Sequence, residues 1–99
     1  MGPLIRAINY IADAIKDEFP DVAVCTLAYG STAAPPLTQA RDNVMIQLAP
    51  LGADYAHPFT HPTNIRLRDM IKEWGTKCSR LFIWNYLGGF ECFLLPFRE

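Results

Sequence analysis

The stretch Leu81-Phe82-Ile83-Trp84-Asn85-Tyr86 decides the fold, because consecutive apolar residues are followed at once by polar aromatic ones. A short strand that is apolar on both faces is typical of a parallel sheet covered by helices. Two further segments share this pattern: residues 22–29, which end in Tyr29, and residues 44–49, which lead into Asp54-Tyr55-Ala56-His57. Ligands of such sheets bind beyond the carboxyl ends of the strands, so the sequence predicts three strand ends that meet at one rim.

Composition and charge indicate a globular domain and argue against several classes of partner. The chain has 99 residues, of which 51% are hydrophobic and 19% are charged, as expected for one globular domain at most. Nine basic and ten acidic residues give a net charge of -1 without a block of either sign, which argues against nucleic acid or anionic lipid as a partner. No apolar run approaches the ~20 residues of a membrane span, and no signal-peptide pattern opens the chain.

Helical spacing appears twice. Apolar residues at steps of three and four predict a first helix between Pro3 and Pro20, with one stripe toward a sheet formed by Leu4, Ile8, Ile11, Ile15 and Phe19. A second helix begins near Pro62 and carries Leu67, Met70, Ile71, Trp74 and Cys78 on one face. Residues 30–43 and 50–62 read as loops on the ligand side. The prediction is an α/β fold with about three parallel strands and two covering helices.

Such a sheet leaves both edges open, and the segment 90–97 is strongly apolar. We therefore expect residues 1–99 to form a single α/β segment that is a fragment of a larger TIM barrel, that is, a partial (β/α) barrel. Open edges of apolar strands also predict self-association. Cys25, Cys78 and Cys92 are odd in number and widely spaced, so we expect buried, reduced thiols.

Several short motifs occur in one order along the chain. They are Phe19-Pro20-Asp21-Val22, Thr26-Leu27-Ala28-Tyr29, Pro35-Pro36, Arg41-Asp42-Asn43-Val44, Ala56-His57-Pro58, Trp74, Phe82-Ile83-Trp84-Asn85-Tyr86 and Leu94-Leu95-Pro96-Phe97. With this series, the chain resembles an uncharacterised domain of bacterial carbohydrate-active proteins, which follows an α-glucuronidase-type N-terminal domain and is similar to a glycoside-hydrolase TIM barrel. The resemblance implies that this chain corresponds to the later strands of that barrel. It also implies that full-length relatives are secreted or periplasmic.

Two positions depart from the family pattern. The family usually has a carboxylate just before the Ala-His-Pro loop, where this chain retains only Asp54, and it usually reads Trp-Asp-Tyr where this chain has Trp84-Asn85-Tyr86. An amide cannot act as an acid, a base or a nucleophile, so Asn85 can at best hydrogen-bond a sugar hydroxyl. Glycoside hydrolysis needs two carboxyl groups across the scissile bond. We expect the isolated chain to be inactive.

The candidate residues each have a structural alternative. Asp54 is the candidate catalytic carboxylate, or it caps its own turn. His57 is a candidate substrate hydrogen-bonder, or a loop histidine bound to backbone. His57 and His61 lack a third ligand, so no metal site is expected.

The other candidate substrate-binding residues are aromatic or polar and lie at strand ends or in the second loop: Tyr29, Tyr55, Trp84, Asn85 and Tyr86. Flat aromatic faces near a rim can stack on a pyranose ring, although packing alone would also explain them. The expected function is the carbohydrate-binding portion of a glycoside-hydrolase-like barrel that acts on uronic-acid-containing or related polysaccharide, without a cofactor. The alternative is a small noncatalytic α/β module that binds carbohydrate or a protein partner.

Overall fold

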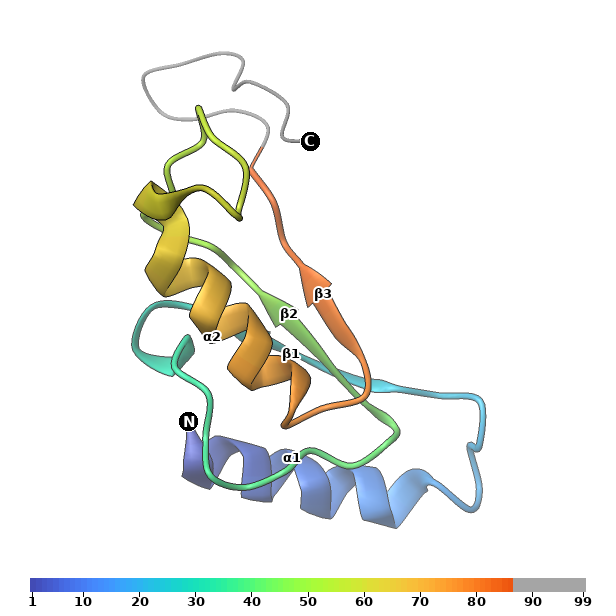
Figure 1. Cartoon of the computed structure of the whole chain (residues 1–99). Coiled ribbons are helices and arrows are strands. Elements are labelled where there is room, and N and C mark those ends of the chain that lie inside the picture. The colour runs from blue at the N-terminus through green and yellow to red at the C-terminus, as the bar shows by residue number, and fades with distance from the viewer. Residues whose placement is uncertain (87–99) are drawn as a thin grey trace.

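The computed structural model describes residues 1–86, and its elements follow the predicted order (Figure 1). The elements are α1 (Gly2–Ile15), β1 (Val24–Ala28), η1 (Gly30–Thr32), β2 (Val44–Leu48), η2 (Pro62–Asn64), α2 (Ile65–Gly75) and β3 (Leu81–Ile83). The strands pair in parallel in the order β1-β2-β3. The α/β fold class is therefore confirmed as an open three-stranded sheet with two helices. Within residues 1–86, no helix has the length and apolar character of a membrane span.

Both helices pack on the same face of the sheet. Side chains of a strand alternate between the two faces, and the inward residues of β2, Val44, Ile46 and Leu48, are completely buried. The core that they form with the two helices and β1 contains Ile5, Ile8, Ala12, Ala28, Val44, Ile46, Leu48 and Trp74. The predicted inner face of α2 is confirmed for Leu67 and Trp74, which are buried on it, whereas Cys78 lies beyond the helix, which ends at Gly75.

The opposite face of the sheet is uncovered by the residues that the structure describes. Leu27 of β1 is 45% exposed, and Phe82 of β3 is 52% exposed. The prediction of strands buried on both faces is therefore wrong for residues 1–86. The apolar residues on this second face are of the kind found in a sheet that is covered on both sides, but neither α1 nor α2 lies on that side.

The buried arc of α1 also differs from the predicted stripe. Leu4, Ile11 and Phe19 are exposed, while Ile5, Ile8, Asn9 and Ala12 are buried. The helix ends at Ile15, and a turn closed by the bond from the Phe19 N–H to the Ile15 carbonyl follows it. Apolar residues extend around more than half of this helix, so their spacing alone could not identify the arc that packs.

A buried amide and a buried indole fix the long connection between β1 and β2. Asn9 of α1 donates from Nδ2 to the Gln39 carbonyl (2.8 Å) and accepts at Oδ1 from the Arg41 N–H (3.0 Å). Trp74 of α2 donates from Nε1 to the Ala33 carbonyl at 2.7 Å. Two helices on one side of the sheet thus hold a loop that has no regular structure of its own beyond η1.

The expectation of buried thiols is wrong for Cys25, which is exposed on the uncovered face of β1. Cys78 is half-buried, donates from Sγ to the Trp74 carbonyl (3.3 Å), and has its pKa raised by burial. Cys92 and the apolar segment 90–97 lie outside the described residues.

Trp74 gives a direct test of this packing. Trp74→Phe should destabilise the chain by about 1–3 kcal/mol, because it removes ring volume and leaves the Ala33 carbonyl without its donor. The same change at the half-exposed Trp84 should cost less than about 0.5 kcal/mol. Urea unfolding of both variants measures the difference, and equal losses would contradict the assigned core.

Candidate functional site

Asn64 organises the loop that follows β2. Its side chain is 3% exposed, although it stands at the N-cap of α2. Nδ2 donates to the carbonyls of Asp54 (3.0 Å), His57 (3.3 Å) and Pro58 (3.1 Å), and Oδ1 accepts from the Asp54 N–H at 2.8 Å. Sequence reasoning missed this residue. An asparagine just before a helical pattern signals an N-cap, but here the amide caps the loop instead of the helix.

Asp54 binds both its own turn and a histidine. Its Oδ1 accepts from the Ala56 N–H at 3.0 Å, and its Oδ2 lies 2.7 Å from Nδ1 of His57. The pKa of Asp54 is lowered, first by the hydrogen bond from His57, then by the Thr63 hydroxyl and the Ala56 N–H, against an opposing effect of burial. The carboxyl is therefore ionised at neutral pH, which suits a charged partner and not a general acid.

This pairing orients the His57 ring. A carboxylate that accepts from Nδ1–H leaves Nε2 as an acceptor in the neutral ring. Within residues 1–86, Nε2 of His57 has no hydrogen-bond partner, and the side chain is 43% exposed. His57 can therefore accept from a ligand hydroxyl at Nε2, while Asp54 holds the ring in place.

His61 lies face to face with His57. The ring centroids are 3.9 Å apart with an angle of 19° between the planes, and Nδ1 of His61 is 2.9 Å from Oγ1 of Thr63. Ring-nitrogen lone pairs lie in the ring plane, so two stacked rings do not direct them to one ion. Residues 1–86 contain no cluster of three or more potential metal ligands.

Aromatic residues meet at the carboxyl ends of the strands. A hollow of about 220 Å³ on the uncovered face is lined by Leu27, Tyr29, Ala49, Trp84 and Tyr86. Backbone bonds from Ala49 N to the Ala28 carbonyl (3.0 Å) and from Trp84 N to the Leu48 carbonyl (2.9 Å) extend the register by one row. Tyr29, Ala49 and Trp84 form that row, and the hollow exists because the central residue is small.

Tyr55 connects the second loop to this hollow. Its ring meets that of Tyr86 edge to face, with centroids 6.2 Å apart, and its hydroxyl donates to the Pro50 carbonyl at 3.2 Å. Asn85 does not line the hollow; it is exposed, and its Oδ1 accepts from the Tyr86 N–H at 3.1 Å. The structure thus brings together Tyr29, Trp84 and Tyr86, joins Tyr55 to them, and pairs Asp54 with His57.

Comparison with protein families gives a match over nearly the whole chain. The profile of a family described as Domain of unknown function (DUF4838) matches residues 1–98. The chain belongs to this family. The expected membership of an uncharacterised domain family is therefore confirmed. No curated protein and no solved structure matches the chain.

Asn64 should be the most sensitive polar residue of the DUF4838 site. Asn64→Ala removes the partner of one N–H and three carbonyls, so we expect a loss of about 1–3 kcal/mol in unfolding free energy and faster amide exchange at Asp54. Asn85→Ala is the matched control, since this amide is exposed and, within residues 1–86, bonds to the next residue alone. Equal losses of unfolding free energy in the two variants, measured by urea unfolding, would contradict the role of Asn64 in ordering the loop.

The pKa of Asp54 can be measured through its own carboxyl ¹³C signal. We expect a titration midpoint below the usual value of about 3.9, and a rise toward that value in His57→Phe, which keeps a ring and removes the donor. A carboxyl with a lower pKa in the folded chain stabilises it above the unfolded-state pKa, and this contribution is lost as the pH falls through the folded-state pKa. Site-specific detection is required, because Arg41 also lowers the pKa of Asp13. An unchanged midpoint in His57→Phe would disprove the pairing.

Proposed function

We propose that the chain forms the sugar-binding rim of a glycoside-hydrolase-like (β/α) barrel that acts on uronic-acid-containing or related polysaccharide. The observation that supports this most is the hollow whose walls include Tyr29, Trp84 and Tyr86. Three aromatic side chains border one hollow at the carboxyl ends of parallel strands, where α/β proteins bind ligands. Aromatic rings offer an apolar face to the CH groups of a sugar ring.

The distribution of the helices supports the barrel. In a (β/α) barrel the helices surround the sheet, and the opposite face of each strand points inward to a packed interior. Here α1 and α2 lie on one face, and the apolar side chains of Leu27 and Phe82 stand on the other. The barrel itself and its association with an α-glucuronidase domain rest on the resemblance described above.

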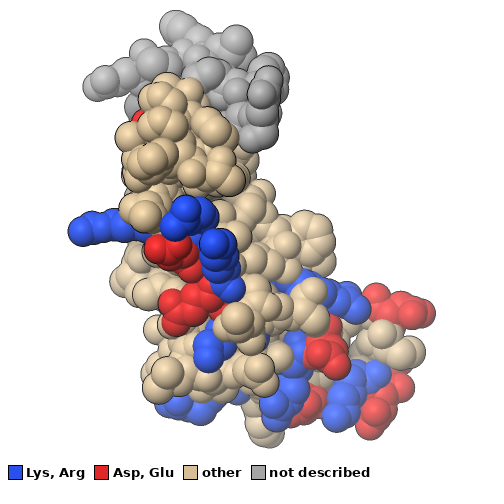
Figure 2. All heavy atoms as spheres, viewed as in Figure 1, with Lys and Arg blue, Asp and Glu red and all other residues tan. Residues whose placement is uncertain are grey.

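The charges favour binding over cleavage. Of the acidic residues between 1 and 86, Asp54 is the one that follows a strand end at this rim, and it is held ionised beside His57. Figure 2 shows charged side chains gathered around the two helices and few on the loop region at the opposite end. A retaining or inverting mechanism needs a second carboxyl group, which Asn85 does not supply. The chain therefore binds sugar without hydrolysing it alone.

The uncovered sheet face supports a second candidate function, that of a noncatalytic module that docks on a protein partner. Large apolar side chains at Leu27, Phe82 and Trp84 are about half exposed there. Contiguous apolar surface of this kind marks interaction sites. The two functions use adjacent parts of one face, so a sugar titration separates them.

Oligosaccharide titration followed by tryptophan fluorescence is the test. We expect a millimolar response to uronic-acid oligosaccharides from Trp84, since the buried Trp74 contributes a constant background, and at least a tenfold weaker binding in Trp84→Ala by calorimetry. Leu37→Ala is the control, as Leu37 is 96% exposed and does not line the hollow. An aryl glucuronide should show no turnover. Absence of binding to any sugar would contradict the sugar-binding proposal and favour the protein-docking module. Hydrolysis of the aryl glucuronide that is lost in Asp54→Asn would overturn the noncatalytic assignment.

A further inference from the structure

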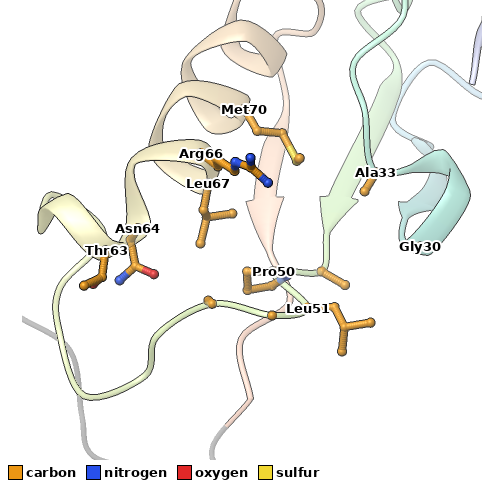
Figure 3. A pocket seen from close by; sticks show the side chains of 12 residues that line it. Gly30, Ala33, Pro50, Leu51, Thr63, Asn64, Arg66, Leu67 and Met70 are labelled. Atoms are coloured by element: carbon orange, nitrogen blue, oxygen red, sulfur yellow. The ribbon is translucent and has the colours of Figure 1, made fainter.

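A second, larger hollow lies on the helix-covered side of the same strand ends. It has a volume of about 430 Å³ and lies between the first turns of α2, the loop after β2 and the segment that begins with η1. Figure 3 shows Leu67 and Met70 on one wall, and Pro50, Leu51 and Ala33 around the others. This volume falls within the range of small-molecule sites, and the walls are mostly apolar.

Arg66 is the cation of this cleft. Figure 3 shows its guanidinium extending from α2 between Leu67 and Met70. Among residues 1–86, no acidic side chain lines the cleft, and Arg66 has no ion pair. Asp69, one turn further along α2, is bound by Arg68, whose Nε and Nη2 both lie 3.2 Å from its Oδ1. The charge of Arg66 is therefore not neutralised by its own helix.

Two glycines with positive φ line the cleft. Gly52 has φ +80 and Gly30 has φ +54, and a Cβ at either position would meet nothing within 4 Å. Gly52 lies in a turn closed by the bond from the Ala53 N–H to the Pro50 carbonyl at 3.2 Å. A positive φ at this place in a turn favours glycine, so the backbone at Gly52 borders the cleft without a side chain.

We propose that this cleft binds a small anion, a carboxylate or a phosphate monoester, that carries a compact apolar body. The guanidinium fork of Arg66 pairs with two oxygens of the anion, and the body rests on the accessible side chains of Met70 and Leu51. This site is separate from the aromatic hollow, since Ala49 is the one residue that lines both. It does not depend on the proposed sugar binding.

Three probes with the same phenyl body test the charge requirement. Phenylacetate, phenyl phosphate and the neutral phenylacetamide are titrated separately into the ¹⁵N-labelled full chain. We expect saturable shifts at Gly52 and at the Arg66 side-chain Nε for one or both anions, and binding at least about tenfold weaker for the amide. The stronger of the two anions identifies the ligand class.

Paired substitutions on α2 test the residue. Arg66→Gln should weaken anion binding at least about tenfold, while Arg68→Gln, which removes the same charge from an arginine already paired with Asp69, should change it less than about twofold. A thermal melt of each variant verifies folding. Equal effects of the two substitutions, amide binding as strong as anion binding, or no shifts with either anion would each overturn the proposal. Loss of sugar binding in Trp84→Ala leaves this site unaffected, so the two proposals fail independently.

Discussion

The alternation of side chains across a parallel sheet, with both helices on one face, is the constraint on which the rest of the structure depends. In β2 it sends Val44, Ile46 and Leu48 into the core, and it leaves the intervening positions on the other face. At the strand ends the same alternation places Tyr29 and Trp84 on the uncovered side. The core and the candidate sugar site are thus opposite faces of the same short strands. A shift of register by one residue would exchange them.

Two buried amides hold the loops that this sheet positions. Asn9 and Asn64 are the buried polar residues among residues 1–86. Asn9 satisfies backbone groups of a loop distant from it in sequence, and Asn64 satisfies those of the loop that directly precedes its helix. A loop that lies over a core carries polar backbone groups which must find partners. An amide supplies donors and an acceptor at one point without a charge to desolvate. The connection after β1 and the site loop after β2 are therefore ordered by side chains from helices.

Sequence patterns predicted the secondary structure well where a pattern of apolar residues is compatible with one way of packing alone. Residues 44–49 alternate little in polarity yet form β2 almost as expected, and the spacing of Leu67 and Trp74 identified the inner face of α2. The pattern failed for α1, because its apolar arc is wider than the face that packs and Asn9, a polar residue, belongs to the buried side. It also failed to show that one face of β3 is uncovered. Asn64 carries the sequence signal of a helix N-cap, whereas its side chain bonds to the preceding loop. Ala49 carries no local signal of its place between the two hollows.

The two candidate sites differ in chemistry because they lie on different faces of one strand end. Ala49 marks the boundary, since it lines both hollows. On the uncovered side, the walls come from strand ends and their following residues, which supply aromatic rings and no charge. On the covered side, α2 contributes its first turns, and its exposed helical positions can carry an arginine at no cost to the core. An aromatic hollow without charged walls and a cleft with one arginine therefore follow from one topology, in which helices are present on one side of the sheet and strands alone form the other.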